Sequence, residues 1–77
     1  MPNSSLLRGL GEEIRERRTR LDFSQEALAH AAGLHRNLIG KLERGDENPT
    51  LLTLLSIATE LDVSVSELII AAERRRR

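Results

Sequence analysis

Residues 24–45, SQEALAHAAGLHRNLIGKLERG, constrain the fold more than any other part of the chain. Their pattern predicts two short helices joined by a tight turn. Ser24 is suited to begin the first helix, because its hydroxyl can accept an amide proton left unpaired in the first turn. Gly33 is suited to end it, since a residue without Cβ enters the left-handed conformation at little cost. Ile39 and Leu42, three residues apart, mark the buried side of the second helix.

The rest of the chain predicts three more helices, so the expected fold class is all-α. The five helices are expected at about residues 5–21, 24–32, 35–44, 51–61 and 65–73. Thr50 is a candidate N-cap, and Ser64 with Glu67 forms a capping box. On the fourth helix the expected buried face consists of Leu51, Leu54, Leu55, Ala58 and Leu61. On the fifth helix it consists of Val65, Leu68, Ile69 and Ala72.

The spacing of Gln25, Ala29, Gly33, Ile39 and Leu42 resembles the helix-turn-helix of the phage repressor and Cro family, which Xre-type bacterial regulators share. The resemblance extends over roughly residues 10–70, and the run LHRNLIGKLERG also resembles the controller proteins of restriction–modification systems. It implies a compact five-helix, lambda-repressor-like DNA-binding domain with a central helix-turn-helix. We expect this single domain to occupy residues 1–77.

The resemblance also implies how the chain would bind double-stranded DNA. In this motif the first helix lies across the phosphate backbone, and the second enters the major groove with its N-terminal residues leading. The expected base-reading residues are His35, Arg36, Asn37, Gly40 and Lys41. The expected phosphate-binding residues are Ser24, Gln25, Arg44 and Asn48, with Gln25 alternatively steadying Arg36.

Several positions depart from the family pattern. His35 stands where Ser, Thr or Asp is common, so we expect a weaker cap on the recognition helix. Asp46 and Glu47 lie in a loop that often faces phosphates, which leaves backbone contacts from that loop open.

Two structural roles are expected of residues outside the recognition helix. The resemblance pairs Arg18 with Glu43 in a buried salt bridge between the first helix and the end of the recognition helix. Gly11 lowers the helix propensity of the first helix by about 1 kcal/mol relative to alanine, and a close contact between helices is the usual reason for such a glycine.

Leu52, Ile69 and Ile70 are the candidate dimer contacts. Leu52 and Ile70 point away from the predicted buried faces of their helices, and family members of this length often pair through their last helices. The alternative is that Ile70 is a single exposed apolar residue, as many proteins have.

The charge of the chain is balanced overall but uneven along the sequence. The net charge is zero, with eight basic and six acidic residues up to position 44, then six acidic and no basic residues over 45–73. A basic half carrying the helix-turn-helix can still present a positive face to phosphates. The basic tail 74–77 could favour a helix C-terminus, be solvated or contact DNA.

Composition argues against other classes of protein. There is no cysteine and no apolar run long enough to span a membrane, so a cytoplasmic protein is expected. Gly33 interrupts the helix between His30 and His35, which are the only histidines. We therefore expect neither an enzyme nor a metal site or cofactor.

The favoured function is a sequence-specific transcriptional regulator, a homodimer on a near-palindromic operator that controls its own gene. The alternative is an antitoxin whose main partner is a toxin protein and which binds DNA for autoregulation.

Overall fold

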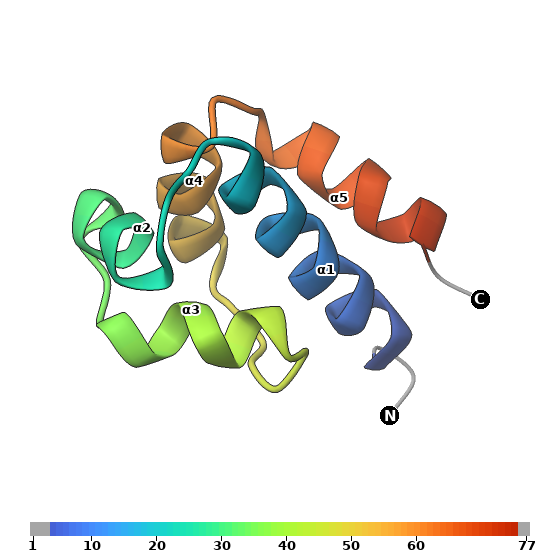
Figure 1. Cartoon of the computed structure of the whole chain (residues 1–77). Helices are drawn as coiled ribbons and strands as arrows, with labels where there is room; N and C mark the ends of the chain where they lie inside the picture. Colours follow the sequence, from blue (N-terminus) through green and yellow to red (C-terminus); the bar gives the residue numbers. More distant parts are fainter. Residues whose placement is uncertain (1–3, 76–77) are drawn as a thin grey trace.

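Five helices follow one another in a computed structural model that describes residues 4–75. They are α1 (Ser4–Arg20), α2 (Gln25–Ala32), α3 (Arg36–Glu43), α4 (Leu51–Glu60) and α5 (Val65–Arg75), shown in Figure 1. No strand occurs within the described range, and the predicted all-α fold is confirmed. None of these helices is both long and apolar enough to cross a membrane.

The helices begin at the polar residues that the sequence indicates. The Ser24 hydroxyl accepts a hydrogen bond from the amide three residues later at 3.0 Å, and Thr50 does the same at 3.1 Å. Ser64 accepts from the Glu67 amide at 3.0 Å, while the Glu67 carboxylate accepts from the Ser64 amide at 3.4 Å. Each bond satisfies an amide that has no partner within its helix.

Left-handed residues end the helices. Gly33 has a φ of 71° at the end of α2, and Gly45 has a φ of 76° after α3. Asp22 and Asp62, with φ values of 60° and 57°, do the same after α1 and α4. Aspartate tolerates this region better than most residues, which explains how Asp22 replaces the glycine common in the family.

The helix bounds differ from those expected by one or two residues. Ser24 and His35 are N-caps, so α2 and α3 begin one residue later than expected. The last helix continues past residue 73 to Arg75. Arg74 and Arg75 are therefore helical rather than part of a tail, and Arg76 and Arg77 lie outside the described residues.

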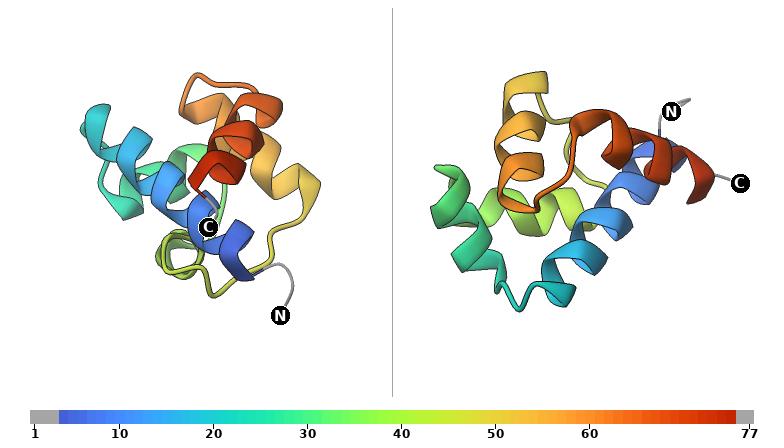
Figure 2. Two further views of the ribbon diagram at one scale, coloured as in Figure 1. Left: turned by 90° about the vertical axis from the view of Figure 1, so that its right-hand side faces the viewer. Right: turned by 90° about the horizontal axis from the view of Figure 1, so that it is seen from above.

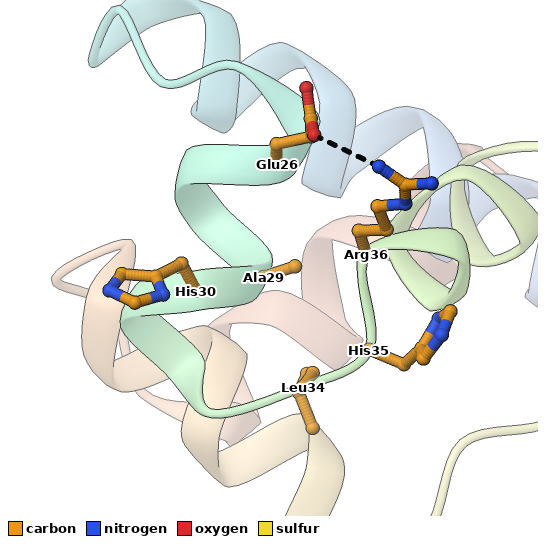
Figure 3. Close-up of a pocket in the computed structure, with 6 residues that line it drawn as sticks. All are labelled: Glu26, Ala29, His30, Leu34, His35 and Arg36. Atoms are coloured by element: carbon orange, nitrogen blue, oxygen red, sulfur yellow. Dashed lines mark ion pairs between the residues drawn. The ribbon is translucent and has the colours of Figure 1, made fainter.

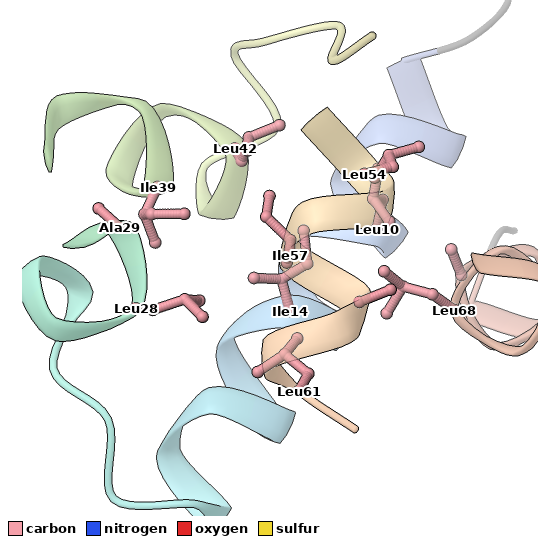
Figure 4. Packing of buried hydrophobic residues seen from close by; sticks show 12 residues of the cluster. Leu10, Ile14, Leu28, Ala29, Ile39, Leu42, Leu54, Ile57, Leu61 and Leu68 are labelled. Carbon is pink, nitrogen blue, oxygen red and sulfur yellow. The ribbon is translucent and has the colours of Figure 1, made fainter. Parts of the chain in front are cut away.

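The core lies between all five helices. Figures 1 and 2 show α1 beside α5, while α2 packs on α3 and α4, and α3 also packs on α1. Figure 4 shows the buried side chains that point into the shared space. The twelve buried apolar residues are Leu10, Ile14, Leu28, Ala29, Ile39, Leu42, Leu54, Ile57, Ala58, Leu61, Leu68 and Ala72.

Two glycines let backbones meet on α1. A Cβ at Gly11 would lie 2.3 Å from the carbonyl oxygen of Leu42, so α3 can approach only a residue without a side chain. The expected close contact at Gly11 is confirmed. A Cβ at Gly9 would lie 2.5 Å from the carbonyl oxygen of Ala72 in α5. The two glycines thus bring α3 and α5 close to the same helix.

The prediction for the buried face of α4 was wrong at two positions. Leu51 and Leu55 are 70% and 52% exposed. The buried stripe follows Leu54 and Ile57, and Leu55 lies ~100° from Leu54 around the helix axis because a turn holds 3.6 residues. Leu51 occupies the first turn at the edge of the stripe.

Candidate nucleic-acid interface

The turn between α2 and α3 holds the two helices at a fixed angle. The Leu34 amide donates to the Ala29 carbonyl at 2.8 Å, and the Gly33 amide donates to the His30 carbonyl at 3.1 Å. Ala29 is buried where the helices meet. Its short side chain allows the close approach, since a longer one would push the two helices apart. The arrangement leaves α3 along one outer edge of the molecule, visible in Figures 1 and 2.

One side of α3 is apolar and buried, and the other is polar and open. Ile39 and Leu42 are buried. The expected base-reading residues His35, Arg36, Asn37 and Lys41 are all exposed. Gly40 differs from them because it is buried.

Gly40 is buried, although its place four residues after Arg36 puts it on the same side of the helix, as expected. A Cβ there would lie 3.3 Å from Nη1 of Arg44 and 3.6 Å from Oε1 of Gln25. These two polar side chains cover the Gly40 backbone.

His35 fills the capping position at the start of α3. Its Nδ1 accepts a hydrogen bond from the Asn37 amide at 3.2 Å, and its backbone is extended with φ −65° and ψ 137°. The imidazole thus does the work of the Ser, Thr or Asp that this position usually holds.

A single carboxylate joins α3 to the rest of the motif. Arg18 Nε and Nη2 donate to the two Glu43 oxygens at 2.5 and 3.0 Å, and Arg18 Nη1 donates to the Phe23 carbonyl at 2.8 Å. Gln25 Nε2 donates to the same carboxylate at 2.9 Å. The structure thus brings together Arg18 and Glu43, which were paired from the sequence, and adds Gln25.

Arg36 has a neighbour that the sequence did not indicate. Its Nη1 lies 3.6 Å from the carboxylate of Glu26 on α2, with both side chains more than 70% exposed. Figure 3 shows the two pointing toward one another across an open pocket, while His30 projects away from Arg36. Glu26 rather than Gln25 therefore stands beside Arg36. Only the packing of α2 on α3 creates this pair, so no local sequence signal could have revealed it.

Comparison with known proteins identifies the motif. The family described as helix-turn-helix matches residues 14–68, which is more than half of the chain. The chain belongs to the helix-turn-helix family. It carries the DNA-binding domain of a transcriptional regulator and is related to the controller proteins of restriction–modification systems.

The relatives include proteins of similar size. Control protein C.SmaI of Serratia marcescens is 45% identical over 60 residues, which are 78% of this chain and 71% of that protein. The restriction–modification controller protein C.AhdI of Aeromonas hydrophila has a TM-score of 0.78 at 44% identity, covering 80% of this chain and 94% of its own. The clp gene regulator ClgR of Corynebacterium glutamicum has a TM-score of 0.87 at 26% identity, covering 94% of this chain and 92% of its own.

The expected phosphate-binding residues of this helix-turn-helix protein are all exposed, namely Ser24, Gln25, Arg44 and Asn48. They differ in what else they contact. The Arg44 Nε lies 3.3 Å from Asp46, and both side chains are 64% exposed. Such an exposed pair is weak in water.

The expected dimer residues fall into two groups. Leu52 and Ile70 are 74% and 48% exposed, whereas Ile69 is half-buried and packs against the core. Leu51 and Leu55 widen the exposed apolar surface of α4.

Within residues 4–75 no group of three or more His, Asp or Glu side chains is arranged to hold a metal ion.

Proposed function

We propose that this helix-turn-helix protein is a controller-like regulator that binds a near-palindromic operator as a homodimer and controls its own gene. The observation that carries the proposal is the two-sided character of α3. Its apolar side is buried in the core, and the exposed residues on its other side, His35, Arg36, Asn37 and Lys41, are all polar. A helix of this kind fits the major groove of B-DNA, where each base pair has its own pattern of donors and acceptors.

Base reading is assigned to His35, Arg36, Asn37 and Lys41. Arg36 can donate to O6 and N7 of guanine, and Asn37 can bond N6 and N7 of adenine. Lys41 lies about one turn further along and can reach guanine or a phosphate. Glu26 holds Arg36 only weakly, because the pair is exposed, so Arg36 can turn toward a base.

Phosphate binding is assigned to Ser24, Gln25, Arg44 and Asn48. The Ser24 oxygen accepts from a backbone amide, which leaves its hydroxyl proton free to donate. The Gln25 amide is held by Glu43 at 2.9 Å, so its position relative to α3 is set before DNA arrives. Such contacts orient a protein on DNA without reading its sequence.

Dimer formation is assigned to the exposed side chains of Leu52 on α4 and Ile70 on α5, together with the half-buried Ile69. Exposed leucines at positions 51, 52 and 55 lie along α4, and contiguous apolar surface of this kind commonly marks a protein interface. A two-fold pair would present two recognition helices to half-sites about 34–36 Å apart. The likeness to controller proteins favours this regulator over an antitoxin.

A binding titration tests the proposal. The purified protein is added to the DNA upstream of its own gene and to a scrambled duplex of equal length, each at two salt concentrations. We expect selective binding that survives the higher salt, with two protomers per site. Equal binding to both duplexes that is lost at higher salt would leave only electrostatic attraction and refute the proposal.

A further inference from the structure

The two ring nitrogens of His35 have different surroundings. Nδ1 lies 3.2 Å from the Asn37 amide nitrogen. A backbone amide can only donate, so Nδ1 must accept and carries no proton. A neutral imidazole has one protonated nitrogen, which is therefore Nε2.

The remaining nitrogen faces outward. His35 is exposed at the start of α3, and among the described residues its Nε2 has no hydrogen-bond partner. Figure 3 shows the ring beside Arg36 and on the far side of Leu34 from His30. Nε2–H is thus the one polar group that the His35 side chain can offer to a partner.

We infer that His35 is a donor-only DNA contact, whose Nε2–H bonds an acceptor on DNA while its Nδ1 holds the first turn of the recognition helix. This inference rests on the proposed DNA-binding function. The suitable acceptors are purine N7, guanine O6, thymine O4 and phosphate oxygens. The amino groups of adenine and cytosine are donors, and His35 cannot bond them.

The same geometry couples α3 to pH. Protonation of the ring places a hydrogen on Nδ1, directly opposite the Asn37 amide, and destroys the capping bond. It also adds a positive charge at the positive end of the helix dipole. The charged or titratable groups lining the same pocket are Arg36 of α3 and Glu26 and His30 of α2.

Nuclear magnetic resonance of the free protein tests the tautomer without DNA. Long-range ¹H–¹⁵N correlations at about pH 7.5 should place the His35 proton on Nε2. The Asn37 amide signal should follow the titration of His35, and its hydrogen exchange should quicken as the ring is protonated. His30 is the internal control, because its titration should leave the Asn37 amide unchanged. A proton on Nδ1 at the higher pH, or an Asn37 amide indifferent to His35, would overturn the inference.

Two variants separate the cap from the DNA contact. His35→Ser keeps a capping oxygen but replaces the ring donor by a hydroxyl on a much shorter side chain, which does not reach as far as Nε2, whereas His35→Ala removes both the cap and the donor. We expect His35→Ser to fold like the wild type and to bind the operator about fivefold more weakly, the loss of one hydrogen bond. His35→Ala should bind more weakly still.

The scrambled duplex identifies the acceptor. A loss confined to the operator indicates a base edge, and an equal loss on both duplexes indicates a phosphate; either outcome supports the inference. Undiminished binding of both duplexes by His35→Ser would overturn it. Failure of the proposed function looks different, because the wild type itself would then fail to distinguish the operator from the scrambled DNA.

Discussion

Arg18 and Glu43 form a two-bonded ion pair across the centre of the motif, at 2.5 and 3.0 Å. The side chains are only 11% and 4% exposed, although α1 and α3 lie on the outside of the core. Arg18 also holds the Phe23 carbonyl, and Glu43 also holds Gln25. The pair therefore links α1, the turn before α2, the start of α2 and the end of α3.

Glu43→Ala should destabilise the fold by about 3 kcal/mol, because it leaves the Arg18 charge buried without its partner. Urea unfolding followed by circular dichroism measures the change. Asp46→Ala is the matched control, since it breaks an ion pair whose side chains are both 64% exposed and should cost less than about 1 kcal/mol. Equal losses from the two variants would contradict the burial of the Arg18–Glu43 pair.

Gly11→Ala should destabilise the fold although alanine is the better helix former. The added methyl group would lie 2.3 Å from the Leu42 carbonyl oxygen, and overpacking of this kind costs about 1–3 kcal/mol. Gly40→Ala is the control, because its nearest neighbour at 3.3 Å is the flexible end of Arg44, and it should gain up to about 1 kcal/mol. The prediction fails if thermal unfolding ranks the two variants in the opposite order.

The fold could be predicted because local signals and helical periodicity agree along the chain. Ser24, Gly33, Thr50 and the Ser64 capping box mark helix ends by chemistry that depends on only a few neighbouring residues. Exposure was harder to predict, since the orientation of α4 depends on how five helices share one core. A pattern of leucines every three or four residues does not say where the buried stripe ends, which is why Leu55 was misplaced.

The candidate site was predictable in its members but not in their contacts. The family pattern points to Arg36, but only the crossing of α2 and α3 brings Glu26 within 3.6 Å of it. The burial of Gly40 depends likewise on the side chains of two other segments. The bonding of each polar group is a tertiary property, which spacing along one helix cannot supply.

Acid should weaken the packing of α5 on α1. Arg75 lies 2.8 Å from Glu13 and 2.5 Å from Glu16. Burial raises the pKa of Glu13, but hydrogen bonds from Arg75 and Arg17 outweigh it and leave the pKa below its ordinary value of 4.5. Hydrogen bonds from Arg75 and then Arg20 lower the pKa of Glu16.

A carboxyl with a lower pKa in the folded state stabilises the protein above the unfolded pKa and loses this effect as the pH falls. We therefore expect Arg75→Gln to be less stable than the wild type near neutral pH. The difference in free energy of unfolding between the two proteins should narrow as the pH drops through the ordinary carboxyl pKa of 4.5 and below. Urea unfolding at a series of pH values measures it, with Arg74→Gln, an exposed neighbour, as control. A gap independent of pH would show that Arg75 acts through packing alone.

Arg36→Ala should remove discrimination at one base pair of the operator, a loss of about 1–3 kcal/mol. Folding should be unaffected, because the Glu26 pair is exposed and weak. Competition binding with every single-base variant of the operator measures the change. Arg20→Ala removes the same charge from a 61% exposed side chain on α1 and should leave base preference intact. A uniform loss across all sequences would mean that Arg36 only binds phosphate.

Ile70→Asp should convert the proposed dimer to a monomer in sedimentation equilibrium. The substitution places a charge at the proposed apolar interface, where burying it without a partner is unfavourable. Leu21→Asp is the control, because Leu21 is 49% exposed, close to the 48% of Ile70, but lies in the turn after α1. Both variants should fold, since neither side chain belongs to the buried core. The Ile70 variant should also lose operator affinity, because a monomer holds only one recognition helix. Dissociation by Leu21→Asp with an intact Ile70→Asp dimer would move the interface to the surface around Leu21.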